Sequence, residues 1–223
     1  SCWQPRPRWV WSCEPLAARR ASATASADRW RCRSCGYAHD SFVFSCTACG
    51  SVMEADYSGT THFSLLGLAP AFELERSAVD QAYKMLQRKL HPDNFAQASP
   101  ETRELAEAHS ARLNEAAAVL RSPLRRSGYW MELHGRRVLE EDQRMDDAAT
   151  MMEVMEVSEA IEEAKTKAEI EQLIEENAAK VRQMEGELSS IFRGEDWGDA
   201  RRLIERLQML ERLAERLNDW QAP

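Results

Sequence analysis

Two Cys-x-x-Cys-Gly segments constrain the fold of this 223-residue sequence more than any other feature. Cys32 and Cys35 form the first pair, Cys46 and Cys49 form the second, and ten residues separate the pairs. Two thiolates three positions apart on a tight turn reach one metal ion, and a second such turn completes a tetrahedron. Residues 29–54 are too few to fold on apolar burial alone, so the metal would supply the folding energy. We therefore expect a small metal ribbon here.

Structural zinc suits four thiolates, although a rubredoxin-like iron site uses the same ligands and stays open. Gly36 and Gly50 each follow the second Cys of a pair, where a positive φ turns backbone amides toward sulfur. Phe42-Val43-Phe44 predicts a short strand between the pairs. Two alternatives fit less well: disulfides suit a secreted chain, and a redox Cys-x-x-Cys usually accompanies a βαβ pattern, which the sequence does not show.

The first 31 residues contain six Arg, only two acidic residues, and many Ala and Ser. They include no apolar core of the kind that a secretory signal has. An Arg-rich, Ser-rich, acid-poor leader is typical of a mitochondrial transit peptide. We predict that residues 1–28 are a disordered targeting leader and that the protein works in the mitochondrial matrix, a second location in the cytoplasm being left open. A plain disordered tail is the alternative.

Charge divides the rest of the chain. Residues 140–223 hold 23 acidic and 11 basic side chains, whereas residues 1–139 hold 14 and 18. This change of sign suggests two units with different partners. The formal net charge of −8 argues against a nucleic-acid partner. No stretch reaches the roughly 18 to 20 apolar residues that span a membrane, so we expect no membrane partner.

Residues 57–136 have the period of helices. A short apolar turn at residues 61–68 precedes a helix that must end near Leu90, because Pro92 disfavours helical geometry at His91. A second helix starts after Ser99, with proline in its first turn. The expected apolar faces are Val79, Tyr83, Leu86 and Leu90 in the first helix and Leu105, Ala108, Leu113, Ala116 and Leu120 in the second.

Between the two helices, His91, Pro92 and Asp93 fall in the loop of an antiparallel hairpin. Asp93 is suited to an Arg on a partner, and Lys84 and Arg88 form a basic stripe on the solvent face of the first helix. A further helix begins at Ser122-Pro123 and ends at His134-Gly135.

The order of Leu-Leu-Gly-Leu turn, basic helix, His-Pro-Asp loop and second helix resembles a J domain. The resemblance implies a 70-kDa heat-shock ATPase chaperone of the DnaK type as partner, engaged by the loop residues together with Lys84 and Arg88. The chain would then activate the ATPase and not itself be an enzyme. Asn94 stands where most J domains have Lys, and Leu90 stands where many have Tyr.

Residues 140–223 predict an antiparallel three-helix bundle with short connections. The helices are expected from near Asp146 to about Glu163, from a capping box at residues 166–169 to about Phe192, and from near Asp196 onward. Met151, Met152 and Met155 on the first helix either fill core gaps or, flanked by Glu153, Glu156 and Glu159, form an adaptable binding face.

A four-cysteine segment, a J-type hairpin and an acidic bundle in this order are similar to the HscB family of iron–sulfur co-chaperones, in its animal mitochondrial form. The resemblance implies an IscU-type cluster scaffold as a second partner and recipient iron–sulfur proteins as a third. It assigns scaffold binding to Met151, Met152, Met155, Glu156, Glu159 and Met209. Bacterial members carry Leu or Phe at several of these positions.

The expected fold class is mostly α: a small four-cysteine metal ribbon, a J-domain helical hairpin with flanking helices, and a C-terminal antiparallel three-helix bundle. Two other functions stay open, a zinc-ribbon adaptor that binds protein or nucleic acid and a thiol redox enzyme. The role of the cysteine segment and the oligomeric state, monomer or homodimer, are not determined by the sequence.

Overall fold

A computed structural model describes residues 30–136 and 148–221. The predicted leader, residues 1–28, lies outside the described residues, as do residues 137–147, where the first bundle helix was expected to begin near Asp146. None of the helices in the described ranges is both long enough and apolar enough to cross a lipid bilayer.

The middle of the chain forms the predicted hairpin, here called the hairpin unit. It consists of α1 (His62–Leu65), α2 (Arg76–Leu90), a 3₁₀ turn (Pro92–Phe95), α3 (Pro100–Arg121) and α4 (Pro123–Leu133). The side chains of Ser99 and Ser122 accept hydrogen bonds from the first turns of α3 and α4, where proline follows each cap.

The carboxy-terminal helices, here called the bundle, are α5 (Ala148–Glu163), α6 (Lys167–Gly194) and α7 (Trp197–Asn218). Thr166 and Glu169 form the predicted capping box at the start of α6, and the side chain of Asp196 caps α7. An apolar core of leucine and isoleucine side chains runs between α6 and α7.

Residues 30–53, the cysteine unit, contain two tight turns and no regular strand in their described backbone. The predicted strand at residues 42–44 is therefore wrong. One isolated β-bridge flanks each Cys-x-x-Cys turn. Arg31 pairs with Ala38 around the first turn, and Ser45 pairs with Val52 around the second. Phe42 and Phe44 instead pack against the core of the hairpin unit.

The apolar face of α3 also differs from the expected one. Ala108 is exposed, whereas Ala106 and His109 are buried together with Leu113. Counting back from Leu113 in steps of four and three reaches positions 109 and 106, so a strict helical period selects the observed face.

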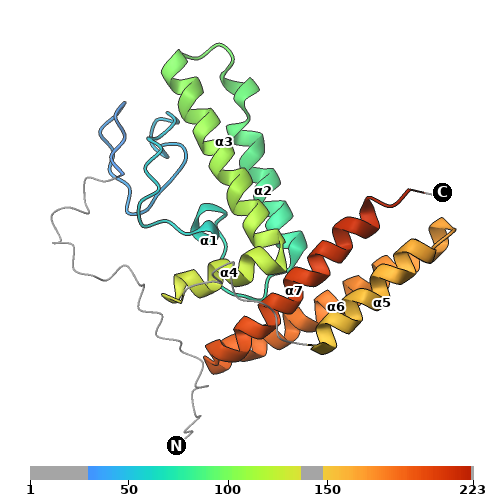
Figure 1. Cartoon of the computed structure of the whole chain (residues 1–223). Coiled ribbons are helices and arrows are strands. Elements are labelled where there is room, and N and C mark those ends of the chain that lie inside the picture. Colours follow the sequence, from blue (N-terminus) through green and yellow to red (C-terminus); the bar gives the residue numbers. More distant parts are fainter. Residues whose placement is uncertain (1–29, 137–147, 222–223) are drawn as a thin grey trace, which may run out of the picture.

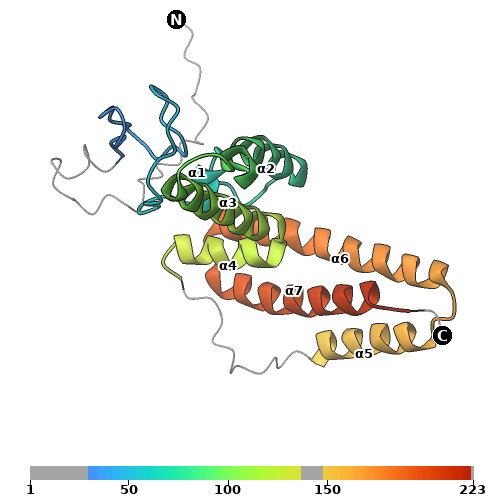
Figure 2. The same cartoon turned by 90° about the horizontal axis from the view of Figure 1, so that it is seen from above.

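Figure 1 shows the hairpin of α2 and α3 standing away from the bundle, with the cysteine unit beside α3. Viewed from above, α4 lies against α7, between the hairpin and the bundle (Figure 2). Phe72 and Met131 of the hairpin unit belong to the same buried cluster as the core of the bundle. The two units therefore meet through a continuous apolar contact.

Candidate functional site

The loop with His91 and Asp93 lies at the end of the hairpin farthest from the bundle (Figure 1). The Asp93 side chain is 90% exposed and the His91 side chain 51% exposed. The backbone N–H of Asp93 donates to Nδ1 of His91 at 3.3 Å, and Oδ2 of Asp93 lies 3.5 Å from the same nitrogen. The turn thus points a carboxylate into solvent from a constrained backbone, an arrangement suited to a cationic side chain on a partner.

The two departures from the J-domain pattern have structural roles here. Nδ2 of Asn94 donates to the carbonyl of Arg88 at 2.8 Å, which satisfies one of the free carbonyls at the end of α2. Leu90 is 1% exposed and belongs to the core of the hairpin unit. Both residues strengthen the hairpin next to the loop.

The basic face of α2 continues from this loop. Lys84 and Arg88 lie on this face, and both are exposed as the sequence predicts. Met85 beside them is also exposed, at 56%. A partner that docks on this face meets positive charge around one flexible apolar side chain.

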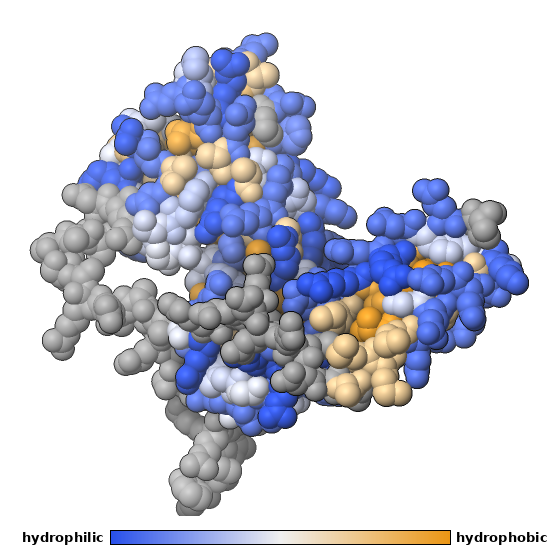
Figure 3. All heavy atoms as spheres, viewed as in Figure 1, coloured by the Kyte–Doolittle hydropathy of each residue, from blue (hydrophilic) through white to orange (hydrophobic). Residues whose placement is uncertain are grey.

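The methionines of α5 form an exposed face, with Met151, Met152 and Met155 between 53% and 62% exposed. Glu156 and Glu159 lie within three or four positions of these methionines, so they share one side of the helix. Figure 3 shows apolar spheres gathered over α5 within a largely hydrophilic surface. The core-filling interpretation of these methionines is therefore wrong, and the binding face stays a prediction.

Glu153 does not belong to this face. Its carboxylate lies 2.8 Å from Nζ of Lys180 on α6 and 2.7 Å from Nη2 of Arg206 on α7. Partial burial raises the pKa of Glu153, but hydrogen bonds and charge from Lys180 and Arg206 outweigh burial and hold the pKa below its ordinary value. Glu153 joins α5 to both neighbouring helices.

Met209 is half-buried on α7. It lies three positions after Arg206, which binds Glu153, and seven before Arg216, which binds Ser158 and Glu162. This spacing places Met209 on the side of α7 that carries α5.

The four cysteine sulfurs converge, all within 4.8 Å of one another. Sγ of Cys32 lies 3.6 Å from that of Cys49, and Sγ of Cys35 lies 3.6 Å from that of Cys46. A regular tetrahedron with Zn–S bonds of about 2.3 Å separates its sulfurs by about 3.8 Å, so the four thiolates fit one ion. The cysteines are free, so disulfides do not account for the cluster.

Two of the four thiols have pKa values shifted in opposite directions. Hydrogen bonds with the hydroxyl and then with the backbone of Ser51 lower the pKa of Cys49 to about 6. The backbone of Tyr37 lowers the pKa of Cys35, but the neighbouring thiols and burial outweigh it and raise this pKa to about 12. Four thiolates this close repel one another unless a metal ion neutralises them.

His109 on α3 is not among the residues expected from the sequence. It is fully buried, with Nδ1 2.8 Å from the hydroxyl of Tyr57 and Nε2 2.9 Å from the carbonyl of Met53. The signal was its spacing of four positions from Leu113, which puts it on the buried face.

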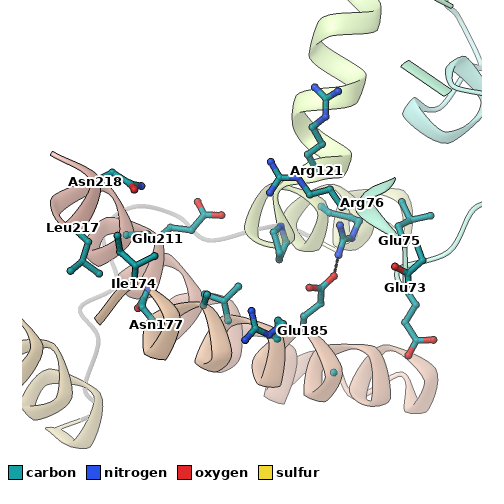
Figure 4. Close-up of a pocket in the computed structure, with 18 residues that line it drawn as sticks. Glu73, Glu75, Arg76, Arg121, Ile174, Asn177, Glu185, Glu211, Leu217 and Asn218 are labelled. Atoms are coloured by element: carbon teal, nitrogen blue, oxygen red, sulfur yellow. Dashed lines mark hydrogen bonds and ion pairs between the residues drawn. The ribbon is translucent and has the colours of Figure 1, made fainter. Parts of the chain in front are cut away.

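A cleft of about 840 Å³ lies between the hairpin unit and the bundle. Figure 4 shows Arg76 and Arg121 on one wall and Ile174 and Leu217 on the other, with an ion pair to Glu185 across it. That ion pair comes from Arg126, a buried side chain of α4. The cleft is the joint between the two units.

Residues 146–218 match the model of the HSCB C-terminal oligomerisation domain. The iron-sulfur cluster co-chaperone protein HscB homolog of Arabidopsis thaliana is 32% identical over 186 residues, which cover 83% of this chain and 72% of that protein. The human iron-sulfur cluster co-chaperone protein HscB is 28% identical over 202 residues, 88% of this chain and 85% of the relative.

Solved structures agree with the sequence matches. The crystal structure of human co-chaperone protein HscB superimposes with a TM-score of 0.70 at 27% identity, over 84% of this chain and 96% of that one. The Jac1 co-chaperone of Saccharomyces cerevisiae has the same fold, with a TM-score of 0.57 at 21% identity, over 73% of this chain and 98% of that one. With the fold, the bundle and the identity over most of both chains in agreement, the protein belongs to the HscB family of co-chaperones.

Proposed function

We propose that this chain is a J-type co-chaperone of iron–sulfur cluster biogenesis that brings a cluster scaffold protein to a 70-kDa heat-shock ATPase chaperone. The chaperone would dock on the loop residues His91, Pro92 and Asp93 and on the basic face of α2. The scaffold would bind the methionine face of α5. ATP hydrolysis by the chaperone would then drive transfer of the cluster to recipient proteins.

One observation carries this proposal. The exposed loop and the exposed methionine face lie on different units of one molecule, with a buried joint between them. Two partners therefore fit at the same time, without competing for one surface. The chemistry of the surfaces differs as well: a cationic face on α2 suits an acidic partner, and apolar sulfur beside carboxylates suits an apolar patch with a basic rim.

The loop assignment is tested with Asp93→Ala. Because the carboxylate is exposed, its removal should leave the fold intact and abolish stimulation of the chaperone's ATPase, with scaffold binding unchanged. Steady-state phosphate release and a scaffold titration measure the two activities. Glu104→Ala, at an exposed acid on α3, is the matched control and should behave like wild type. Stimulation that survives Asp93→Ala rules the loop out.

The scaffold assignment is tested with the double variant Met151→Ala and Met155→Ala. Each truncation removes exposed apolar surface that would be buried on binding, so scaffold affinity should fall at least tenfold, which corresponds to about 1.4 kcal/mol. ATPase stimulation in the absence of scaffold should not change. Met85→Ala is a fair control for scaffold binding because Met85 is as exposed, but lies on α2. An unchanged scaffold titration in the double variant would reject the methionine face.

We further infer that Cys32, Cys35, Cys46 and Cys49 hold one Zn²⁺ ion. The support is the tetrahedral spacing of four sulfurs and the structural character of all-cysteine zinc sites. Elemental analysis of the purified protein should give one zinc per chain, and the colour of an iron–tetrathiolate site would identify iron instead.

The mitochondrial matrix remains our prediction for the compartment, supported by the Arg-rich pattern of residues 1–28. Import of the full chain into isolated mitochondria tests it.

A further inference from the structure

The cysteine unit and the hairpin unit share one buried contact around His109. The carbonyl of Met53 can only accept a hydrogen bond, so Nε2 of His109 carries the proton and donates to it at 2.9 Å. Nδ1 is then the acceptor for the hydroxyl of Tyr57 at 2.8 Å. Both nitrogens of a fully buried neutral imidazole are therefore satisfied, one of them by the chain segment that directly follows the second Cys pair.

Two aromatic rings of the cysteine unit pack around the same histidine. The ring centroid of Phe44 lies 5.3 Å from that of His109, and that of Phe42 lies 5.9 Å away, both edge to face. These two phenylalanines lie between the Cys pairs in the sequence. They pack on the core that also contains Leu113 and Leu90, so the cysteine unit supplies part of the hairpin's hydrophobic core.

Met53 connects this contact to the metal ligands. Its side chain is buried in one small cluster with Cys32 and Cys46. A route of direct contacts thus runs from two ligating residues through Met53 to His109 in the middle of α3.

We propose that the metal held by the four cysteines stabilises the chaperone-activating hairpin, with His109 as the residue that couples the metal site to α3. Without the metal, residues 30–53 are too few to stay folded. The hairpin would then lose the aromatic wall of Phe42 and Phe44, and His109 would keep a buried donor without its acceptor. The coupling rests on the contacts above and on the metal inferred at the four cysteines, and the chaperone-activating role of the hairpin rests on the proposed function.

Coupling of this kind is reciprocal: if the metal stabilises the hairpin by some factor, the folded hairpin raises metal affinity by the same factor, so a substitution in α3 that breaks the contact should weaken metal binding. His109→Phe keeps a ring in place but removes both hydrogen bonds. Position 109 lies on a different unit from the four cysteines. We expect the affinity for Zn²⁺ in the full chain, measured by competition with a chromophoric chelator, to fall at least about fivefold. Tyr57→Phe, which removes only one hydrogen bond, should give a smaller change in the same direction and serves if the first variant fails to fold.

Hydrogen exchange in the wild-type full chain measures the effect of the metal on α3. Removal of Zn²⁺ should increase amide exchange in the middle of α3, around residues 106–113, and leave exchange in the core of α7 unchanged. His134→Phe, a histidine of the hairpin unit at the end of α4, should bind Zn²⁺ like wild type. Unchanged Zn²⁺ affinity in both variants, or α3 exchange that does not respond to Zn²⁺, would overturn the proposal. If the zinc-loaded wild type fails to stimulate the chaperone while the coupling is present, the proposed function fails and the coupling stands.

Discussion

Among single residues, Glu153 shows how two neighbouring positions on one helix take opposite roles. Met152 faces solvent, whereas the carboxylate of Glu153 contacts Lys180 and Arg206 on the two other helices of the bundle. Ile161 of α5 is buried in the bundle core and Val154 and Val157 pack against that core, so the ionic contacts of Glu153 add to an apolar attachment. The orientation of the methionine face therefore depends on a carboxylate behind it.

Glu153→Gln should lower the free energy of unfolding by roughly 1.5 to 3 kcal/mol at neutral pH, the usual range for a hydrogen bond to a charged group. The pKa of Glu153 is lowered in the fold, so its contribution is complete above the ordinary pKa of 4.5 and is lost as the pH falls through the lower folded pKa. Urea unfolding of variant and wild type should thus differ at pH 7 and converge as the pH falls below 4.5 through the folded pKa.

Scaffold affinity should fall in the same variant, although Glu153 does not face the partner. Glu163→Gln, an exposed glutamate at the end of α5, should change neither quantity. An equal loss of stability under acidic and neutral conditions would show that charge at Glu153 is not responsible.

At the scale of an element, the end of α6 departs from the usual pattern of helix termination. Glycine normally occupies the left-handed position just after a helix. Here Gly194 is the last helical residue, and Glu195 takes the left-handed conformation at φ 57° and ψ 28°. Glu195 is the one non-glycine residue with positive φ in the described ranges. The turn between α6 and α7 therefore carries local backbone strain.

Glu195→Gly should stabilise the protein by about 0.5 to 1 kcal/mol. Relief of left-handed strain, about 1 to 2 kcal/mol, exceeds the added chain entropy of glycine in the unfolded state. Chemical denaturation measures the change. The reference variant is Glu187→Gly, in the exposed interior of α6, which should instead destabilise by about 1 kcal/mol. A destabilised Glu195→Gly would mean that the glutamate side chain offsets its own strain.

At the scale of the whole molecule, the joint between the hairpin unit and the bundle decides how the two proposed binding surfaces are held. Arg126 on α4 is 3% exposed; it donates to the carbonyl of Leu120 at 2.7 Å and pairs with Glu185 on α6. Its guanidinium lies 5.1 Å above the ring of Phe72. Ser122 adds a hydrogen bond to Glu211 on α7 at 2.7 Å. These contacts fix α4 against both long helices of the bundle.

Arg126→Ala should weaken this joint by roughly 1.5 to 3 kcal/mol, since a buried charged hydrogen bond is lost. We expect one cooperative calorimetric transition in the wild type and two in the variant, because hairpin unit and bundle then unfold separately. Arg125→Ala, at the exposed neighbouring position, should keep a single transition. A single transition in Arg126→Ala would mean that the apolar contacts alone hold the hairpin unit and the bundle together.

The sequence by itself determined the local features of this protein. Ser99, Ser122, Thr166 and Asp196 mark helix starts because caps act within one turn of the chain. The spacing of the four cysteines defined the metal site, and proline after His91 placed the exposed loop, for the same local reason. The resemblance to the HscB family then supplied the expected partners, which no spacing reveals.

Only the tertiary structure decided which residues meet across the chain. Met53 and His109, Arg126 and Glu185, and Glu153 and Arg206 are each paired over a long stretch of intervening sequence. A helical period tells which side chains share a face, but not what that face contacts or whether it contacts anything. For that reason the methionines of α5 could be interpreted as core or as surface, and Phe42 and Phe44 as part of a strand. Burial depends on the packing of distant segments. That packing left the methionines of α5 exposed and buried His109 at the contact with the cysteine unit.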